Sequence, residues 1–210
     1  MTMNQARRIF ATLALLFSST AMAGPDELHH AIAQANWNNA LYQYQNTPVG
    51  QNIPLLKSLS ENNVVMAQWF LADALARTGN PQEATKWLYT ASLGTRMDSK
   101  ICRTRAAETI EFRFIHVFSP QFSPLRANDQ YRRHGLTQAL AFHGARLSKS
   151  SHPDWACRMI ANESTRKVRT LTTPESRWMD ARNSVLKDYR EQAGLGKTRS
   201  PDLIRIHQVK

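Results

Sequence analysis

The stretch ALARTGNPQEATKWLYTASLG, residues 74–94, places Gly79, Asn80 and Pro81 between two runs of small and aromatic residues. A glycine takes the left-handed conformation that commonly ends a helix, and a proline fits the first turn of the next helix. Small and apolar residues recur at helical spacing on both sides of this turn. The stretch therefore predicts an antiparallel helical hairpin, and we expect its second helix to end at Gly94.

The small and large residues of this hairpin follow the pattern of a known helical repeat. The positions that match are Leu71, Ala72, Gly79, Ala84, Leu88 and Ala91. The hairpin resembles a tetratricopeptide repeat, and EATKWLYTASLG is similar to the second helix of Sel-one-like repeats. Residues 35–44, ANWNNALYQY, repeat the end of the pattern. The resemblance implies an all-α fold of antiparallel helical hairpins.

The resemblance also implies a binding surface. In tetratricopeptide-like hairpins the first helix lines a concave groove, and the matching positions here are Trp69, Phe70, Asp73 and Arg77. These residues form the expected partner-binding groove. The alternative is that Trp69 and Phe70 belong to the core, covered by the second half of the chain.

Helical patterns continue beyond residue 98 and predict an all-helical extension packed on the repeat. We expect helices within residues 100–118 and 130–147, and others that start near Pro153 and Pro174, with a further short helix at residues 54–60. The segment FRFIHVF, residues 112–118, is also compatible with a short strand by alternation. The proline-bearing stretch SPQFSPLRAND, residues 119–129, predicts a loop.

The N-terminus has the features of a secretory signal peptide. Arg7 and Arg8 precede an apolar core at residues 9–17, and Ala21-Met22-Ala23 resembles a cleavage site. The alternative is a membrane anchor, but this core is far shorter than the roughly 20 residues that span a bilayer. We therefore expect residues 1–23 to be removed and the mature chain to be periplasmic or secreted, with no membrane span.

Export would place the two cysteines, Cys102 and Cys157, in an oxidising compartment, where cysteines usually form disulfides. A disulfide between them would restrict the unfolded chain by roughly 4 kcal/mol on the loop-entropy model. The alternative is a reactive thiol, but no CxxC pattern is present. We expect a structural disulfide.

The net charge of +11 is unevenly distributed along the chain. Residues 24–98 contain 4 basic and 6 acidic residues, whereas residues 99–210 contain 21 and 10. We therefore divide the mature chain into a repeat region, 24–98, a basic extension, 99–200, and a tail, 201–210. The basic patch expected in the extension comprises Arg132, Arg133, Arg166, Lys167 and Arg169. We interpret it as a solvated surface or a docking site for an acidic envelope protein, with nucleic acid or cell-wall polymer as the alternative partner.

Catalytic and metal-binding patterns are weak, and we expect no catalytic residue, metal or cofactor. Glu108 and Glu111 have the spacing of neighbours on a helix, which more often means exposed charges than an acid–base pair. His134 and His143 occur without an HExxH motif. The segment GLGKT, residues 194–198, resembles the end of a phosphate-binding loop but lacks its first glycine.

The end of the chain alternates apolar and charged residues in the manner of a half-buried strand. An all-helical domain offers such a strand no partner, so we expect residues 201–210 to be mobile and to add to a sheet edge of a partner. The alternative is a frayed tail without a role.

The sequence is compatible with three functions from different classes. The leading hypothesis is a periplasmic protein–protein interaction scaffold, an accessory of an envelope, secretion or transfer assembly. The alternative is a basic binder of anionic polymer, either cell wall or transferred nucleic acid. The second alternative is an envelope hydrolase, which requires a cleft with perturbed acidic or histidine side chains.

Overall fold

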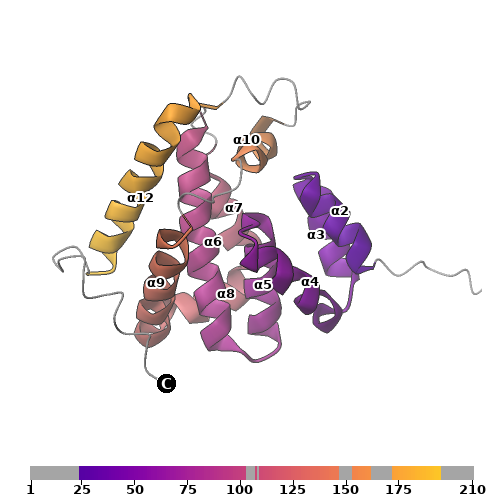
Figure 1. The fold of residues 1–210 in the computed structure, drawn as a ribbon. Coiled ribbons are helices and arrows are strands. Elements are labelled where there is room, and N and C mark those ends of the chain that lie inside the picture. Colours follow the sequence, from indigo (N-terminus) through magenta and orange to yellow (C-terminus); the bar gives the residue numbers. More distant parts are fainter. Residues whose placement is uncertain (1–23, 103–106, 108, 147–152, 162–171, 195–210) are drawn as a thin grey trace, which may run out of the picture.

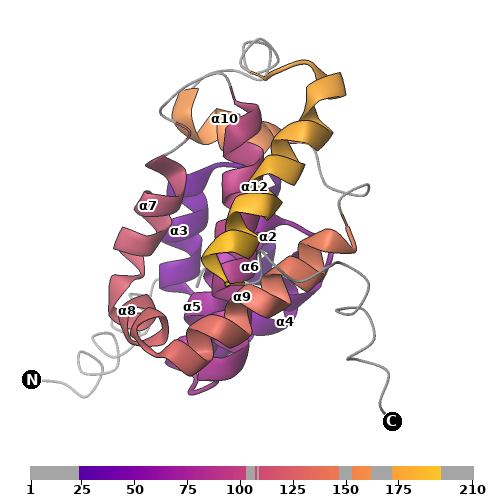
Figure 2. The same ribbon diagram turned by 90° about the vertical axis from the view of Figure 1, so that its left-hand side faces the viewer.

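The computed structural model describes residues 24–102, 107, 109–146, 153–161 and 172–194. Within these ranges the regular secondary structure is helical apart from one isolated antiparallel bridge between Cys102 and Thr172, so the all-α class is confirmed for them. The expected signal peptide and the expected C-terminal tail lie outside the described residues. The helices, drawn in Figures 1 and 2, are α2 (Pro25–Ala33), α3 (Trp37–Asn46), α4 (Val49–Glu61), α5 (Val65–Arg77), α6 (Pro81–Ile101), α7 (Ile110–Val117), α8 (Ser119–Ala127), α9 (Asp129–Gly144), α10 (Asp154–Ala161), the 3-10 helix η4 (Glu175–Arg177) and α12 (Trp178–Gln192).

The predicted hairpin is present as α5 and α6. Gly79 has a φ of +79° directly after α5, and Pro81 opens α6 at its first turn. The central helix α6 contacts α5, α7, α8, α9, α10 and α12. It runs through the middle of the molecule, with α5 on one side and α9 and α12 on the other (Figure 1).

The expectation that the second helix ends at Gly94 is wrong, because α6 continues to Ile101. Gly94 is buried within the helix, where an added Cβ would lie 2.9 Å from Cγ2 of Val65 and 3.1 Å from Cε1 of His143. A glycine inside a helix costs about 1 kcal/mol in propensity. Here it allows α5 and the ring of His143 to approach the α6 backbone closely.

The main core consists of aromatic side chains around α5. Trp69 and Phe70 are fully buried on that helix, and Trp69 stacks on Phe114 of α7 with ring centroids 4.9 Å apart. Trp37 of α3 lies 4.5 Å from the same phenylalanine ring in an edge-on arrangement. Helices from both halves of the chain therefore share this core.

The stretch 119–129, expected to be a loop, instead contains the helix α8. Pro120 occupies the first turn of this helix, where a missing amide hydrogen costs nothing, but Pro124 lies inside it. The side chains of Phe122 and Leu125, which belong to the same helix, are both buried. Burial of these two side chains offsets the cost of the internal proline.

A second, smaller apolar cluster joins α9 and α12 to the outer face of α6 (Figure 2). Its buried members are Leu93, Met97, Leu136, Ala139, Leu140, Val185, Leu186 and Tyr189. Tyr89 is half-buried and packs against both this cluster and the main core. Gly135 permits the contact between α9 and α6, since a Cβ there would lie 2.4 Å from Cδ2 of Tyr89 and 2.8 Å from the carbonyl oxygen of Thr85.

Other boundaries differ from the expectations by several residues. The short helix expected at residues 54–60 begins earlier, as α4, and contains Pro54. Residues 112–117 of the ambiguous segment are helical and form most of α7, and Phe118 caps its end. Gly194, with a φ of +72°, follows the end of α12 as expected. No helix in the described ranges is long and apolar enough to cross a membrane.

Candidate functional site

A cavity of about 180 Å³ lies where α6, α7, α8, α9 and α12 meet. It forms because α9 and α12 both pack on the outer face of α6 while α7 and α8 turn back alongside it. Polar and aliphatic side chains share its wall. The lining residues are Leu88, Tyr89, Ser92 and Arg96 of α6, Glu111 and Ile115 of α7, Arg126 of α8, Arg132 and Leu136 of α9, and Tyr189 and Gln192 of α12.

Glu111 is held by two side chains of α6. Its Oε2 accepts a hydrogen bond of 2.7 Å from Nε of Arg96, and its Oε1 accepts one of 3.1 Å from the same guanidinium. Oε1 also accepts a 2.5 Å hydrogen bond from the hydroxyl of Ser92. Burial alone would lower the pKa of Arg96, but hydrogen bonding and charge attraction from Glu111 raise it overall. Arg96 and Glu111 thus form a fixed, mutually neutralising pair.

Tyr189 closes the α12 side of the cavity. Its hydroxyl lies 3.3 Å from the carbonyl oxygen of Tyr89 and 3.4 Å from the hydroxyl of Ser92. The guanidinium of Arg96 lies 5.5 Å from the centre of the Tyr189 ring. Burial raises the pKa of the Tyr189 hydroxyl, so this group stays protonated and acts as a hydrogen-bond donor.

Arg126 and Arg132 line the cavity from positions that are otherwise exposed to solvent. Arg132 also forms an exposed ion pair of 2.7 Å with Asp129, whereas Arg126 has no such pair with a carboxylate in the described part of the chain. Burial raises the pKa of the Tyr89 hydroxyl, and the nearby charges of Arg126 and Arg132 oppose that increase. The charges of both guanidiniums therefore affect the pKa of the same tyrosine hydroxyl.

This arrangement is suited to binding an anion. Three guanidiniums line the cavity against one carboxylate, and that carboxylate is already occupied by Arg96 and Ser92. The positive charge of Arg126 remains available to a ligand, and that of Arg132 is shared with Asp129.

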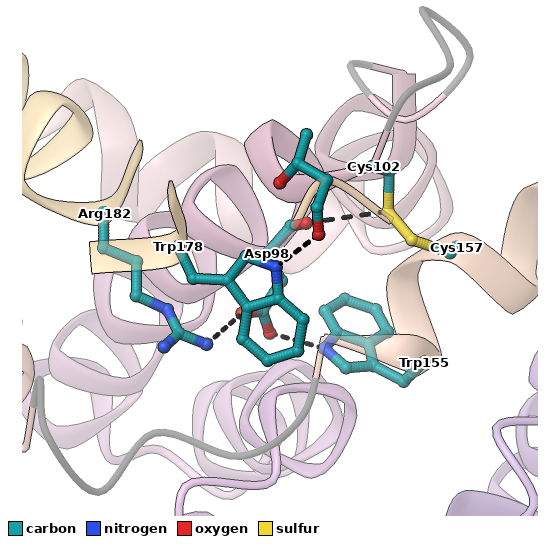
Figure 3. Close-up of a disulfide and its surroundings, with 7 residues drawn as sticks. Asp98, Cys102, Trp155, Cys157, Trp178 and Arg182 are labelled. Carbon is teal, nitrogen blue, oxygen red and sulfur yellow. Dashed lines mark hydrogen bonds and ion pairs between the residues drawn. A yellow bond between two sulfur atoms is a disulfide. The ribbon is translucent and has the colours of Figure 1, made fainter. Parts of the chain in front are cut away.

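A second polar cluster surrounds the disulfide and has a structural role (Figure 3). The predicted bond between Cys102 and Cys157 is present and ties the end of α6 to α10. One turn before Cys102, the buried carboxylate of Asp98 accepts a 2.6 Å hydrogen bond from Nε1 of Trp155 and forms a 3.6 Å ion pair with Arg182. The cluster thus joins α6, α10 and α12, and none of these residues lines the cavity.

The expected groove residues are mainly part of the core. Trp69 and Phe70 are 0% exposed and Asp73 is 2% exposed, and only Arg77 reaches the surface. Asp73 accepts a 2.5 Å hydrogen bond from the hydroxyl of Tyr44 and lies 3.7 Å from Arg77. Burial raises the pKa of Asp73, and these two partners oppose that increase.

These burials do not support a groove lined by the first helix of the hairpin. The physical reason is that α7 and α8 cover the face that an isolated hairpin would expose. Trp69 contacts Phe114 of α7 and Phe122 of α8, with ring centroids 4.9 and 5.9 Å apart. The alternative that Trp69 and Phe70 are core residues fits this arrangement.

The basic patch is described only in part. Arg132 and Arg133 are both exposed on α9, but only Arg132 lines the cavity. Arg166, Lys167 and Arg169 lie outside the described residues. Sequence reasoning missed Arg96, Arg126 and Tyr89, and the excess of arginine in the extension was a signal for Arg126 alone.

The carboxylates and histidines considered as catalytic or metal-binding candidates do not form a common site in the described residues. Glu111 faces Arg96 rather than a neighbour on its own helix, and Glu108 lies outside the described residues. His143 is 4% exposed, and its Nε2 lies 2.8 Å from the carbonyl oxygen of Thr90. Burial lowers the pKa of His143 to about 4. No group of three metal-ligating side chains occurs in the part of the chain that the structure describes.

Comparisons with known proteins add no assignment, since no family model, curated protein or solved structure matches the chain.

Proposed function

We propose that this chain is an exported interaction scaffold that binds an acidic protein partner on the side formed by α8, α9 and α12. The observation that carries the proposal is the unbalanced charge of the cavity, where Arg126 and Arg132 face a carboxylate that is already neutralised by Arg96. Opposite charge on a partner would be drawn to this side and oriented there. The proposal moves the binding surface away from the expected groove on α5.

Two further observations support the proposal. The disulfide between Cys102 and Cys157 is compatible with a periplasmic or extracellular location. The α5–α6 hairpin has the turn and the close helix contact that a tetratricopeptide-like or Sel-one-like unit requires. We propose that this hairpin is the rigid base on which the basic extension presents its binding side.

The test is capture of partners from envelope extract at low and high salt by the mature, oxidised protein. The cavity variant is Arg126→Gln combined with Arg132→Gln. A matched control, Arg133→Gln combined with Arg190→Gln, removes the same charge from exposed positions that do not line the cavity. We expect the cavity variant to weaken capture by about tenfold or more, because hydrogen-bonded charge pairs are lost. The control should change capture far less.

Two outcomes would overturn the proposal. Undiminished capture by the cavity variant would place the partner elsewhere. Equal losses in both variants, together with a steep fall in affinity with salt toward nucleic acid, would instead support the anionic-polymer alternative.

A further inference from the structure

We infer that the cavity receives a single carboxylate side chain, a glutamate or aspartate of the partner, and that the aliphatic wall accommodates the stem of that side chain. This inference rests on the proposed function and deepens it by naming the chemical group that is recognised. It follows from the charge, the hydrogen-bond donors and the shape of the cavity.

The available charge suits one monoanion. Arg96 is neutralised by Glu111, and Arg132 shares its charge with Asp129, which leaves Arg126 as the guanidinium without a described carboxylate partner. One uncompensated guanidinium balances a carboxylate, whereas a doubly charged group such as a phosphate monoester would keep one unpaired negative charge.

The donors are arranged for an acceptor with two oxygens. A guanidinium presents a planar fork that matches a carboxylate. The Tyr89 hydroxyl is close to both arginines. Arginine only donates hydrogen bonds, so the Tyr89 hydroxyl cannot donate to either guanidinium and can donate its proton to a ligand oxygen.

The size and the wall of the cavity limit the occupant to one side chain. A cavity of about 150 Å³ holds a benzene-sized molecule, and this cavity measures about 180 Å³. Leu88, Ile115 and Leu136 provide an aliphatic wall beside the polar groups. Methylene groups between a carboxylate and a peptide backbone would contact this wall and leave water.

The first experiment uses small probes on the mature, oxidised protein. The probes are the α-amide of N-acetylglutamate, the neutral glutamine analogue, and the α-amide of N-acetylphosphoserine, each followed by NMR titration. We expect the glutamate probe to bind about tenfold or more tightly than the glutamine probe, since a charge-assisted hydrogen bond is lost in the latter. It should also bind more tightly than the phosphoserine probe, because the single uncompensated guanidinium leaves a dianion with an unpaired charge.

Variants then separate insertion into the cavity from attraction to a charged surface. Ile115→Trp fills the cavity and keeps every charge, and the partial exposure of Ile115 limits the disturbance to the core. Tyr89→Phe removes one hydroxyl and serves if the tryptophan variant does not fold. We expect Ile115→Trp to abolish glutamate-probe binding and Tyr89→Phe to reduce it by about tenfold. Arg133→Gln with Arg190→Gln should leave it unchanged.

Capture of the partner distinguishes failure of this inference from failure of the proposed function. Loss of capture in the tryptophan variant as well as in the arginine variant would support both. If only the arginine variant loses capture, the proposed function stands and the inference is overturned. Tighter binding of phosphoserine, or probe binding that is insensitive to Ile115→Trp, would also overturn it. Probe binding in the cavity with capture unaffected by every cavity variant would reject a partner side chain as the occupant.

Discussion

Acidification should destabilise the protein through His143, which is buried on α9 with its Nε2 at 2.8 Å from the carbonyl oxygen of Thr90. That geometry requires the neutral ring to donate from Nε2. Burial lowers the pKa of His143 to about 4, and the positive charges of Arg146 and Arg182 act in the same direction. The ordinary pKa of 6.5 applies to the unfolded chain, so the unfolded state binds more protons between these values.

The magnitude follows from the interval between the two pKa values. One pKa unit corresponds to about 1.36 kcal/mol, so an interval of about 2.5 amounts to about 3.4 kcal/mol once the pH is below 4. At pH 5 linkage gives a loss of about 2 kcal/mol. This stabilisation is fully present above pH 6.5 and decreases as the pH falls toward 4.

The assay is urea denaturation of the wild type and of His143→Gln at pH 7 and pH 5. Glutamine keeps an N–H donor for Thr90 but does not titrate. We expect the wild type to lose about 2 kcal/mol more than this variant between the two pH values. His134→Gln, on the same helix and partly exposed, is the control and should follow the wild type. Identical pH dependence of the wild type and His143→Gln would refute the reasoning.

Three other perturbations have defined outcomes. Gly135→Ala should lower the free energy of unfolding by about 1–3 kcal/mol, because its Cβ would lie 2.8 Å from a backbone oxygen; Gly144→Ala, with open space at the end of the same helix, should be neutral or stabilising in the same denaturation assay. Replacing Cys102 and Cys157 with serine should cost about 4 kcal/mol on the loop-entropy model, and equal midpoints for the oxidised wild type and the variant would contradict this. Tyr44→Phe should cost about 1–3 kcal/mol in thermal or urea unfolding, since it removes a hydrogen bond to a buried carboxylate, and an unchanged stability would contradict that estimate.

Local chemistry was sufficient to predict the hairpin and the disulfide. Gly79 and Pro81 each have a conformational preference that their neighbours do not alter, and both adopt the predicted roles. Cys102 and Cys157 are the two cysteines of the sequence, so an oxidising compartment left one intramolecular pairing.

The helix boundaries that were wrong depend on distant residues. A glycine that ends a helix and a glycine that admits a neighbouring helix look alike in sequence, and at Gly94 the choice is made by Val65 and His143. The prolines of α8 indicated a loop, but burial of Phe122 and Leu125 outweighs them. The packing at Gly94 and the burial of the α8 side chains both depend on residues distant in sequence, so a local pattern does not predict them.

The cavity was not predictable for a similar reason. Its wall combines side chains from five helices, and its central ion pair joins Arg96 of α6 to Glu111 of α7. No short motif encodes such a pair. The excess of arginine beyond residue 98 indicated the sign of the charge but not the place where it gathers.

The attachment of α12 through a separate apolar cluster has a consequence for the order in which the molecule opens. This helix is held by the second apolar cluster and by the ion pair of Arg182 with Asp98, so we expect it to detach while the aromatic core around α5 stays intact. Regions of this kind exchange their amide hydrogens at a lower free energy than global unfolding requires. Tyr189 and Gln192 leave the cavity wall whenever α12 detaches. Amide exchange in α12 should therefore slow when the cavity is filled, and the lifetime of the bound state should be limited by the opening of this one helix.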